Sequence, residues 1–106
     1  MAFHLTTRWG ASEREPTMAQ MQEALHELEI DDLEHPDTWL EHESGWCLSA
    51  FSNGLLVWEN SESDDIPRHM NGVTRERVLE LWTKLAQGRF ADIEAEPWLA
   101  GYEDPK

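Results

Sequence analysis

The sequence predicts an α+β fold, with an antiparallel sheet of about four strands in β-α-β-β-β-α order, two helices on one face and a docked C-terminal segment. Runs that alternate apolar and polar residues, as strands do, occur at the start and in the middle of the chain. Two other stretches carry apolar residues at helical spacing, and glycine turns divide the middle region. The length of 106 residues fits one α+β domain, 1–106.

The opening strand and the first helix are separated by a break at 10–16. Residues 3–9 alternate apolar and polar side chains, which predicts the strand. Thr17 and Gln20 form a capping-box pattern, which begins a helix over 17–29. The apolar stripe of this helix contains Met18, Met21, Leu25 and Leu28.

The middle of the chain predicts a three-stranded meander. Its strands are "TWLEHE" (38–43), "WCLSAF" (46–51) and "LLVWEN" (55–60). Ser44-Gly45 and Asn53-Gly54 have the composition of two-residue hairpin turns and join the strands in order. The polar stretch 61–72 is expected to be a loop.

The last third predicts the second helix and a docked tail. Thr74 is a suitable N-cap, Gly88 is a suitable stop, and one further helical turn is expected over 92–95. The stripe of the second helix contains Val78, Leu81, Trp82 and Leu85. The segment after Pro97 contains Trp98, Leu99 and Tyr102, and it is too apolar for a free tail.

The two-residue turns also predict which side chains share a face of the meander. One face has no formal charge: Leu40, His42, Cys47, Ser49, Phe51, Leu56 and Trp58. The other contains Trp39, Glu41, Glu43, Trp46, Leu48, Ala50, Leu55, Val57 and Glu59. Because burying three unpaired carboxylates would cost several kcal/mol each, the uncharged face is expected to meet the helices. An error of one residue in both turns would exchange residues between the faces.

The charge of the chain is unevenly distributed. The formal net charge is −14, and the stretch 15–67 contains fourteen acidic residues without a Lys or Arg. Such a field repels nucleic acid and anionic membranes and speeds encounter with a basic protein. The chain shows no signal peptide and no apolar run long enough for a membrane span, so a cytoplasmic location is expected.

No motif for catalysis, a cofactor or a metal is present. Cys47, the single cysteine, lies in an apolar strand and is expected to be a buried, inert thiol. The histidines lack metal-ligand spacing, so only tertiary assembly of His35 or His69 with acidic neighbours could form a metal site. Arg68 is expected to form an ion pair with Asp64 or Asp65.

The charged sheet face is the candidate functional surface, because tryptophans anchor protein interfaces and carboxylates pair with Lys or Arg. Its proposed partner-binding residues are Trp39, Glu41, Glu43, Trp46 and Glu59. Such an apolar face requires a cover. Three covers are open: the C-terminal segment, a second copy in a homodimer, or a basic protein partner.

Several stretches give the chain a family resemblance: "HPDTWL", "GWCLSAFSNGLLVWEN", "PRHM", "VLELWTKLAQG" and "EPWLAGY". They resemble those of small, acidic, uncharacterised bacterial proteins, whose size, acidity and α+β layout are similar to immunity proteins of polymorphic-toxin systems. The resemblance implies a protein that neutralises a toxin, and it implies no catalytic residues. The acidity of the chain adds the expectation that this partner is basic and that the protein is not an enzyme.

Other function classes remain open at this point. One is a small ligand-binding or enzymatic domain with a pocket between the sheet and the C-terminal segment. Another is a homo-oligomeric structural protein that buries the Trp39 and Trp46 face. A third is DNA mimicry, which requires carboxylates spaced like phosphates.

Overall fold

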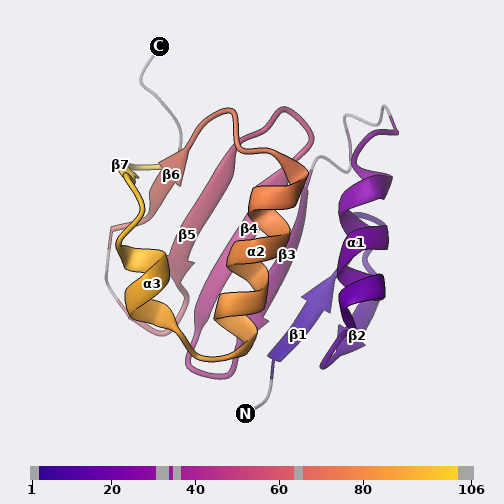
Figure 1. The fold of residues 1–106 in the computed structure, drawn as a ribbon, viewed down its shortest axis with the longest axis horizontal. Helices are drawn as coiled ribbons and strands as arrows, with labels where there is room; N and C mark the ends of the chain where they lie inside the picture. Colours follow the sequence, from indigo (N-terminus) through magenta and orange to yellow (C-terminus); the bar gives the residue numbers. More distant parts are fainter. Residues whose placement is uncertain (1–2, 31–33, 35–36, 64–65, 103–106) are drawn as a thin grey trace.

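The computed structural model describes residues 3–30, 34, 37–63 and 66–102, which form a seven-stranded antiparallel sheet with three helices on one face (Figure 1). The elements in chain order are β1 (Phe3–Thr6), β2 (Ser12–Arg14), α1 (Met18–Glu27), β3 (Asp37–His42), β4 (Trp46–Phe51), β5 (Leu56–Asn60), β6 (Arg68–Met70), α2 (Arg75–Ala86), α3 (Phe90–Glu94) and β7 (Leu99–Ala100). The strand order is β2-β1-β3-β4-β5-β6-β7. The α+β class and the antiparallel sheet are confirmed.

The sheet is larger than predicted because three short strands extend it at both edges. β2 lies in the stretch expected to be a break, and β6 lies in the expected loop 61–72. β7 has only two residues and pairs with β6. In a strand of two or three residues, the alternation of apolar and polar side chains is too short to be recognised in a sequence. Such a strand also forms only where a neighbouring strand is present to pair with it.

Both long helices begin at the predicted caps. The Gln20 amide donates to Thr17 Oγ1 (3.2 Å), and the Thr17 amide donates to Gln20 Oε1 (2.8 Å), which completes the capping box of α1. In α2 the Thr74 hydroxyl accepts from the Arg77 amide (3.2 Å). The four predicted stripe residues of α2 are all buried: Val78, Leu81, Trp82 and Leu85. The short helix α3 covers the predicted turn near 92–95.

Arg8 connects the first strand region to the far end of α1. Its side chain is buried, and its guanidinium donates to the carbonyl oxygens of Glu27 and Ile30. These carbonyls lie at the C-terminal end of the helix, where backbone acceptors lack helical partners and the helix dipole favours a cation. Arg8 therefore fixes α1 against the sheet.

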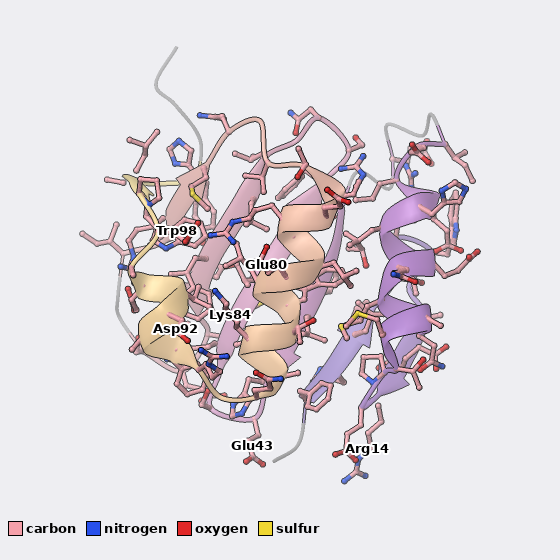
Figure 2. The ribbon with its side chains drawn as sticks, in the orientation of Figure 1. Arg14, Glu43, Glu80, Lys84, Asp92 and Trp98 are labelled. Carbon is pink, nitrogen blue, oxygen red and sulfur yellow. The ribbon has the colours of Figure 1, made fainter. Side chains whose placement is uncertain are left out.

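Stacked tryptophans form one end of the core. Trp46 stacks on Trp58 with ring centroids 4.3 Å apart, and Trp58 faces Trp98 at 6.3 Å. Trp98 lies beside α3 (Figure 2) and packs against the buried cluster, which confirms that the C-terminal segment docks on the domain. Further along the sheet, the indole of Trp82 donates to the Leu48 carbonyl (3.1 Å). This bond satisfies a polar atom that would be costly to bury alone.

Arg68 pairs with a different acid from the one expected. It forms a two-point ion pair with Glu94 of α3, including Nη2 to Oε1 at 2.9 Å, and this pair lowers the pKa of Glu94. Asp64 and Asp65, the predicted partners, lie outside the described residues. The guanidinium thus joins β6 to α3.

The two central turns have three residues each, one more than predicted. The Gly45 amide donates to the His42 carbonyl (2.9 Å), and the Gly54 amide donates to the Phe51 carbonyl (3.1 Å). Gly45 and Gly54 have φ of +95° and +91°. A three-residue hairpin loop places its last residue in this left-handed conformation, which glycine adopts without steric cost.

The longer turns reverse the predicted orientation of β4. Trp39 pairs with Ser49 instead of Ala50, and Ser49 pairs with Val57 instead of Trp58. The face predictions for β3 and β5 are confirmed, whereas those for β4 are wrong. Trp46, Leu48 and Ala50 face the helices, and Cys47, Ser49 and Phe51 lie on the opposite face, because one residue of slip moves every side chain across the sheet.

Replacing Gly45 by alanine is expected to destabilise the fold by about 1 kcal/mol more than replacing Gly10. Both glycines have positive φ, so both alanines are strained by the backbone. An added Cβ at Gly45 would also lie 2.5 Å from Glu62 Cγ and 2.6 Å from Asn60 Oδ1, whereas at Gly10 it meets nothing within 4 Å. Urea unfolding of G45A and G10A measures the difference, and equal losses would contradict the close approach at Gly45.

Candidate functional site

The sheet face opposite the helices is the candidate functional site. All three helices lie on one side of the sheet (Figure 1), and in the part of the chain that the structure describes no helix or strand covers the other side. We call this second side the open face. Its side chains on the three central strands are Asp37, Trp39, Glu41, Cys47, Ser49, Phe51, Val57 and Glu59.

A shallow hollow of about 280 Å³ lies at the centre of the open face. It spans β3, β4 and the end of β5, so residues distant in sequence meet there. Its lining consists of Asp37, Trp39, Glu41, Cys47, Ser49, Glu59 and Ser61. Three carboxylates and one tryptophan therefore surround a floor of small polar side chains.

Cys47 and Ser49 form the floor of this hollow. They are 7% and 8% exposed, and Cys47 Sγ lies 3.8 Å from Ser49 Oγ. Burial is the main cause that raises the pKa of the Cys47 thiol to about 12, and the charges of Glu41, Glu59 and Asp37 contribute to the same rise. The prediction of a buried thiol is confirmed. A thiol that stays protonated is a poor nucleophile, in line with the expected inert character.

The carboxylates around the hollow belong to Asp37, Glu41 and Glu59. Within the described residues, none of Asp37, Glu41 and Glu59 forms an ion pair with Lys or Arg. Burial raises the pKa of Asp37. Glu59 accepts a hydrogen bond from the Tyr102 hydroxyl (2.9 Å), which leaves its charge in place and raises the pKa of Tyr102. The hollow is therefore a concentrated negative site.

Arg14, on the edge strand β2, also belongs to the open face but is distant from the centre of that face. The sheet register places Arg14 opposite His4 and His4 opposite Glu41. Arg14 is thus two strands, roughly 10 Å, from Glu41. Its exposed side chain points away from the sheet (Figure 2).

The structure brings together three of the five predicted binding residues. Trp39, Glu41 and Glu59 line the hollow. Trp46 was placed wrongly, because it faces the helices and stacks on Trp58. Glu43 lies in the turn after β3, is exposed, and points away from the sheet (Figure 2).

Four lining residues were missed by the sequence analysis: Asp37, Cys47, Ser49 and Ser61. Asp37 could have been found, because it precedes Trp39 and Glu41 at the two-residue period of a strand. Cys47 and Ser49 required the correct turn length, since their predicted orientation depended on it. Ser61 lies just beyond β5, where alternation no longer applies.

As far as Tyr102, where the described residues end, the C-terminal segment does not cover the hollow. Trp98 packs on the helix side, and β7 extends the edge of the sheet beside β6. Tyr102 reaches the open face at Glu59 but remains 57% exposed. Within the described residues the segment therefore contributes a rim to the open face.

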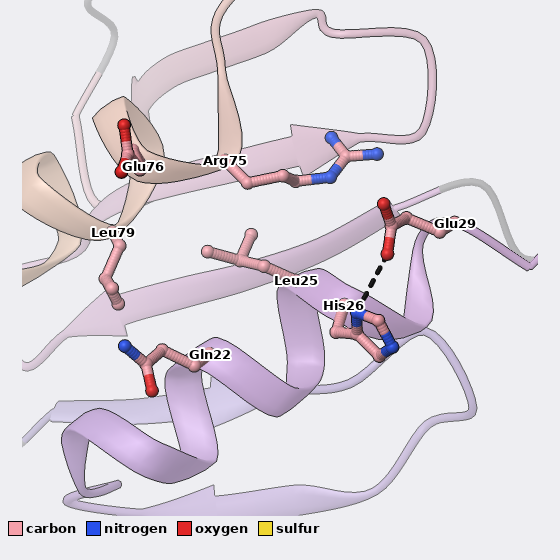
Figure 3. A pocket seen from close by; sticks show the side chains of 7 residues that line it. All are labelled: Gln22, Leu25, His26, Glu29, Arg75, Glu76 and Leu79. Carbon is pink, nitrogen blue, oxygen red and sulfur yellow. Dashed lines mark ion pairs between the residues drawn. The ribbon is translucent and has the colours of Figure 1, made fainter.

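A second hollow, of about 270 Å³, lies between α1 and α2 (Figure 3). Leu25 and Leu79 supply its apolar surface, and His26 forms an ion pair with Glu29 at its rim (2.8 Å). Arg75 projects from α2 and donates to the backbone carbonyls of the β4–β5 turn. Cationic and anionic groups are mixed here, so the groove favours no single class of partner.

The histidines considered for metal binding do not form a site in the described residues. His69 is buried on β6, and its Nδ1 lies 2.9 Å from the Gly101 carbonyl oxygen. His35 lies outside the described residues. Among the residues that are described, no three His, Cys, Asp or Glu side chains are grouped to hold a metal ion.

Comparison with known proteins gives no relative. No protein-family model, curated protein or solved structure matches this chain. Of the helices in the described ranges, none combines the length and the apolar character needed to cross a membrane.

Replacing Asp37 by asparagine is expected to stabilise the fold at pH 7 by about 0.5 kcal/mol. The folded pKa of Asp37 lies above its usual value, so the charged form is disfavoured by folding. The gain should be present at neutral pH and disappear as the pH falls below about 4, where the wild-type carboxyl is protonated in both states. Urea unfolding at several pH values measures it.

Asp92→Asn is the matched control for this measurement. Asp92 is paired with Arg89 (2.5 Å) on the surface of α3, so its charge is compensated and its removal should bring no gain at pH 7. A loss of stability in D37N at pH 7 would contradict the cost assigned to the buried charge.

Alkylation of Cys47 by iodoacetamide is expected to accelerate about a hundredfold between pH 8 and pH 10, because a thiol with a pKa near 12 gains thiolate throughout that range. A thiol with the ordinary pKa of 9.0 would gain only about tenfold. Glu41→Gln should raise the rate at pH 8, and Glu23→Gln on α1 should not. A rate that levels off below pH 10 would contradict the raised pKa.

Proposed function

We propose that this chain is a non-enzymatic protein-binding domain whose open face binds a basic protein and neutralises it, as an immunity or antitoxin-like protein does. The observation that carries the proposal is the group of three carboxylates, Asp37, Glu41 and Glu59, around a half-buried hollow, where no Lys or Arg among the described residues pairs with them. Burial raises the pKa of Asp37, so the charged form of this carboxyl is disfavoured in the free protein, and a partner's Lys or Arg would relieve that cost.

Trp39 adds a reason to expect a protein as the partner. It lines the same hollow as the carboxylates. A guanidinium that enters between the carboxylates can also contact the face of an indole, which binds cations through its π electrons. Tryptophan beside pairable charges is typical of residues that dominate protein interfaces.

The same charges argue against other partners. Nucleic acids and anionic membranes are repelled by a hollow that carries three carboxylates. A second copy bound through its own open face would bring like charges together, which disfavours a homodimer on this surface. A protonated thiol on the floor of the hollow gives little support to an enzymatic function.

An immunity role suits a surface of this kind. Neutralisation of a basic toxin requires only that its cationic surface be occupied, so no reaction is needed at the binding site. The resemblance of the chain to small acidic immunity proteins points to the same role. The acidic stretch 15–67 would speed the encounter.

Capture from an extract of the native host tests this function. The immobilised protein and the control variant E23Q/E76Q should both retain a basic protein, which about 0.5 M salt should release. The double variant E41Q/E59Q should lose most of it. The two variants lose the same formal charge, but Glu23 and Glu76 are exposed on α1 and α2, away from the open face. Mass spectrometry identifies the captured protein.

Two results would reject the proposal. One is equal capture by E41Q/E59Q and the control, which would place the interaction elsewhere on the chain. The other is the absence of any basic protein whose retention depends on the open face.

A further inference from the structure

The proposed function leaves open which part of a basic protein fits the open face. Building on that function, we propose that the partner presents an amphipathic helix, which lies across the strands. Its Lys or Arg residues would lie over Glu41 and Glu59, and its apolar residues over Trp39 and Leu99.

The sheet register arranges the open face in two rows that run across the strands. In the first row Glu41, Cys47 and Glu59 lie directly opposite one another on β3, β4 and β5. The second row continues to the edge of the sheet and consists of Trp39, Ser49, Val57, His69 and Leu99. The first row is acidic from β3 to β5 and continues through His4 on β1 to Arg14 on β2. In the second row large apolar side chains alternate with polar ones.

The spacing within each row matches the repeat of a helix. Adjacent strands are about 4.8 Å apart, so Glu41 and Glu59, two strands apart, are separated by roughly 10 Å. Seven residues of an α-helix rise about 10.5 Å. Two cations seven residues apart on one helix would therefore lie above Glu41 and Glu59 at the same time.

The two accessible apolar residues of the second row also fit the helical repeat. Trp39 and Leu99 lie on β3 and β7, four strands or roughly 19 Å apart, and Val57 between them is buried. Apolar residues at positions i and i+14 of a helix, about 21 Å apart, would lie over both. Leu99 is 49% exposed, so the outer end of this row is accessible to a partner.

The distance between the rows also fits a helix. Neighbouring side chains on one face of a strand are about 7 Å apart along the strand. A helix with its side chains is about 10 Å wide, so two adjacent stripes can contact both rows. A single extended strand would follow one row only.

A pair of synthetic helical peptides of about 20 residues, roughly 30 Å long, tests this inference. Both have apolar residues at i and i+14 and contain two arginines. In the first peptide the two arginines are seven residues apart, on the side of the helix next to its apolar residues. The other has the same composition, with one arginine moved to the opposite side of the helix. Staples on the solvent side keep both helical.

The peptide with aligned arginines should bind about threefold more tightly by calorimetry, since its protein-facing side can form one more ion pair with the carboxylates of the open face. E41Q/E59Q should remove the preference, and E23Q/E76Q should retain it. Amide NMR signals that shift on binding should belong to β3, β4 and β5 and leave α1 and α2 unchanged.

Three outcomes would overturn the inference: equal affinity for the two peptides, shifts confined to the helices, or no binding of either peptide. If any one of these outcomes were found while a basic host protein was still captured through Glu41 and Glu59, the helical form of the partner would be rejected. The proposed function would be retained. Loss of both would reject the function as well.

Discussion

The two glycine-ended turns at Gly45 and Gly54 set the constraint on which the rest of the structure depends. Each turn contains one residue more than a minimal hairpin, and each therefore decides which side of β4 meets the helices. In this register Trp46 stacks on Trp58 and Leu48 accepts the indole bond of Trp82. A slip of one residue would place these apolar side chains on the open face.

The same register produces the negative hollow. With β4 in this orientation, Cys47 and Ser49 lie between the carboxylates of β3 and β5, and no Lys or Arg of the described residues pairs with those carboxylates. The arginines elsewhere serve the structure: Arg8 caps α1, and Arg68 joins β6 to α3. Among the described residues, Arg8 and Arg68 therefore hold elements together, and no Lys or Arg lies at the centre of the open face.

The open face differs from the helix-covered face in how its side chains are buried. A core built on one side of a sheet leaves the other side dependent on its own side chains for cover. Val57 and His69 are almost completely buried there by their neighbours, while Leu99 and Tyr102 remain exposed at the edge. The proposed binding role depends on the acidic carboxylates near the centre of this face and on the exposed apolar residues at its edge.

The sequence by itself determined the α+β class, both capped helices, the three central strands, the buried stripe of α2 and the inert character of Cys47. These features depend on the local pattern of apolar residues and on capping residues, and both can be recognised within one segment of the sequence. It also identified Trp39, Glu41 and Glu59, because the alternation within β3 and β5 was clear. Only the tertiary structure decided the short strands β2, β6 and β7, the partner of Arg68, and the side of the sheet on which Trp46 and Cys47 lie. Short edge strands form only where a neighbouring strand is present to pair with them. The face of the sheet on which the side chains of β4 lie changes when a turn is one residue longer, and a Ser-Gly or Asn-Gly pair does not specify the turn length.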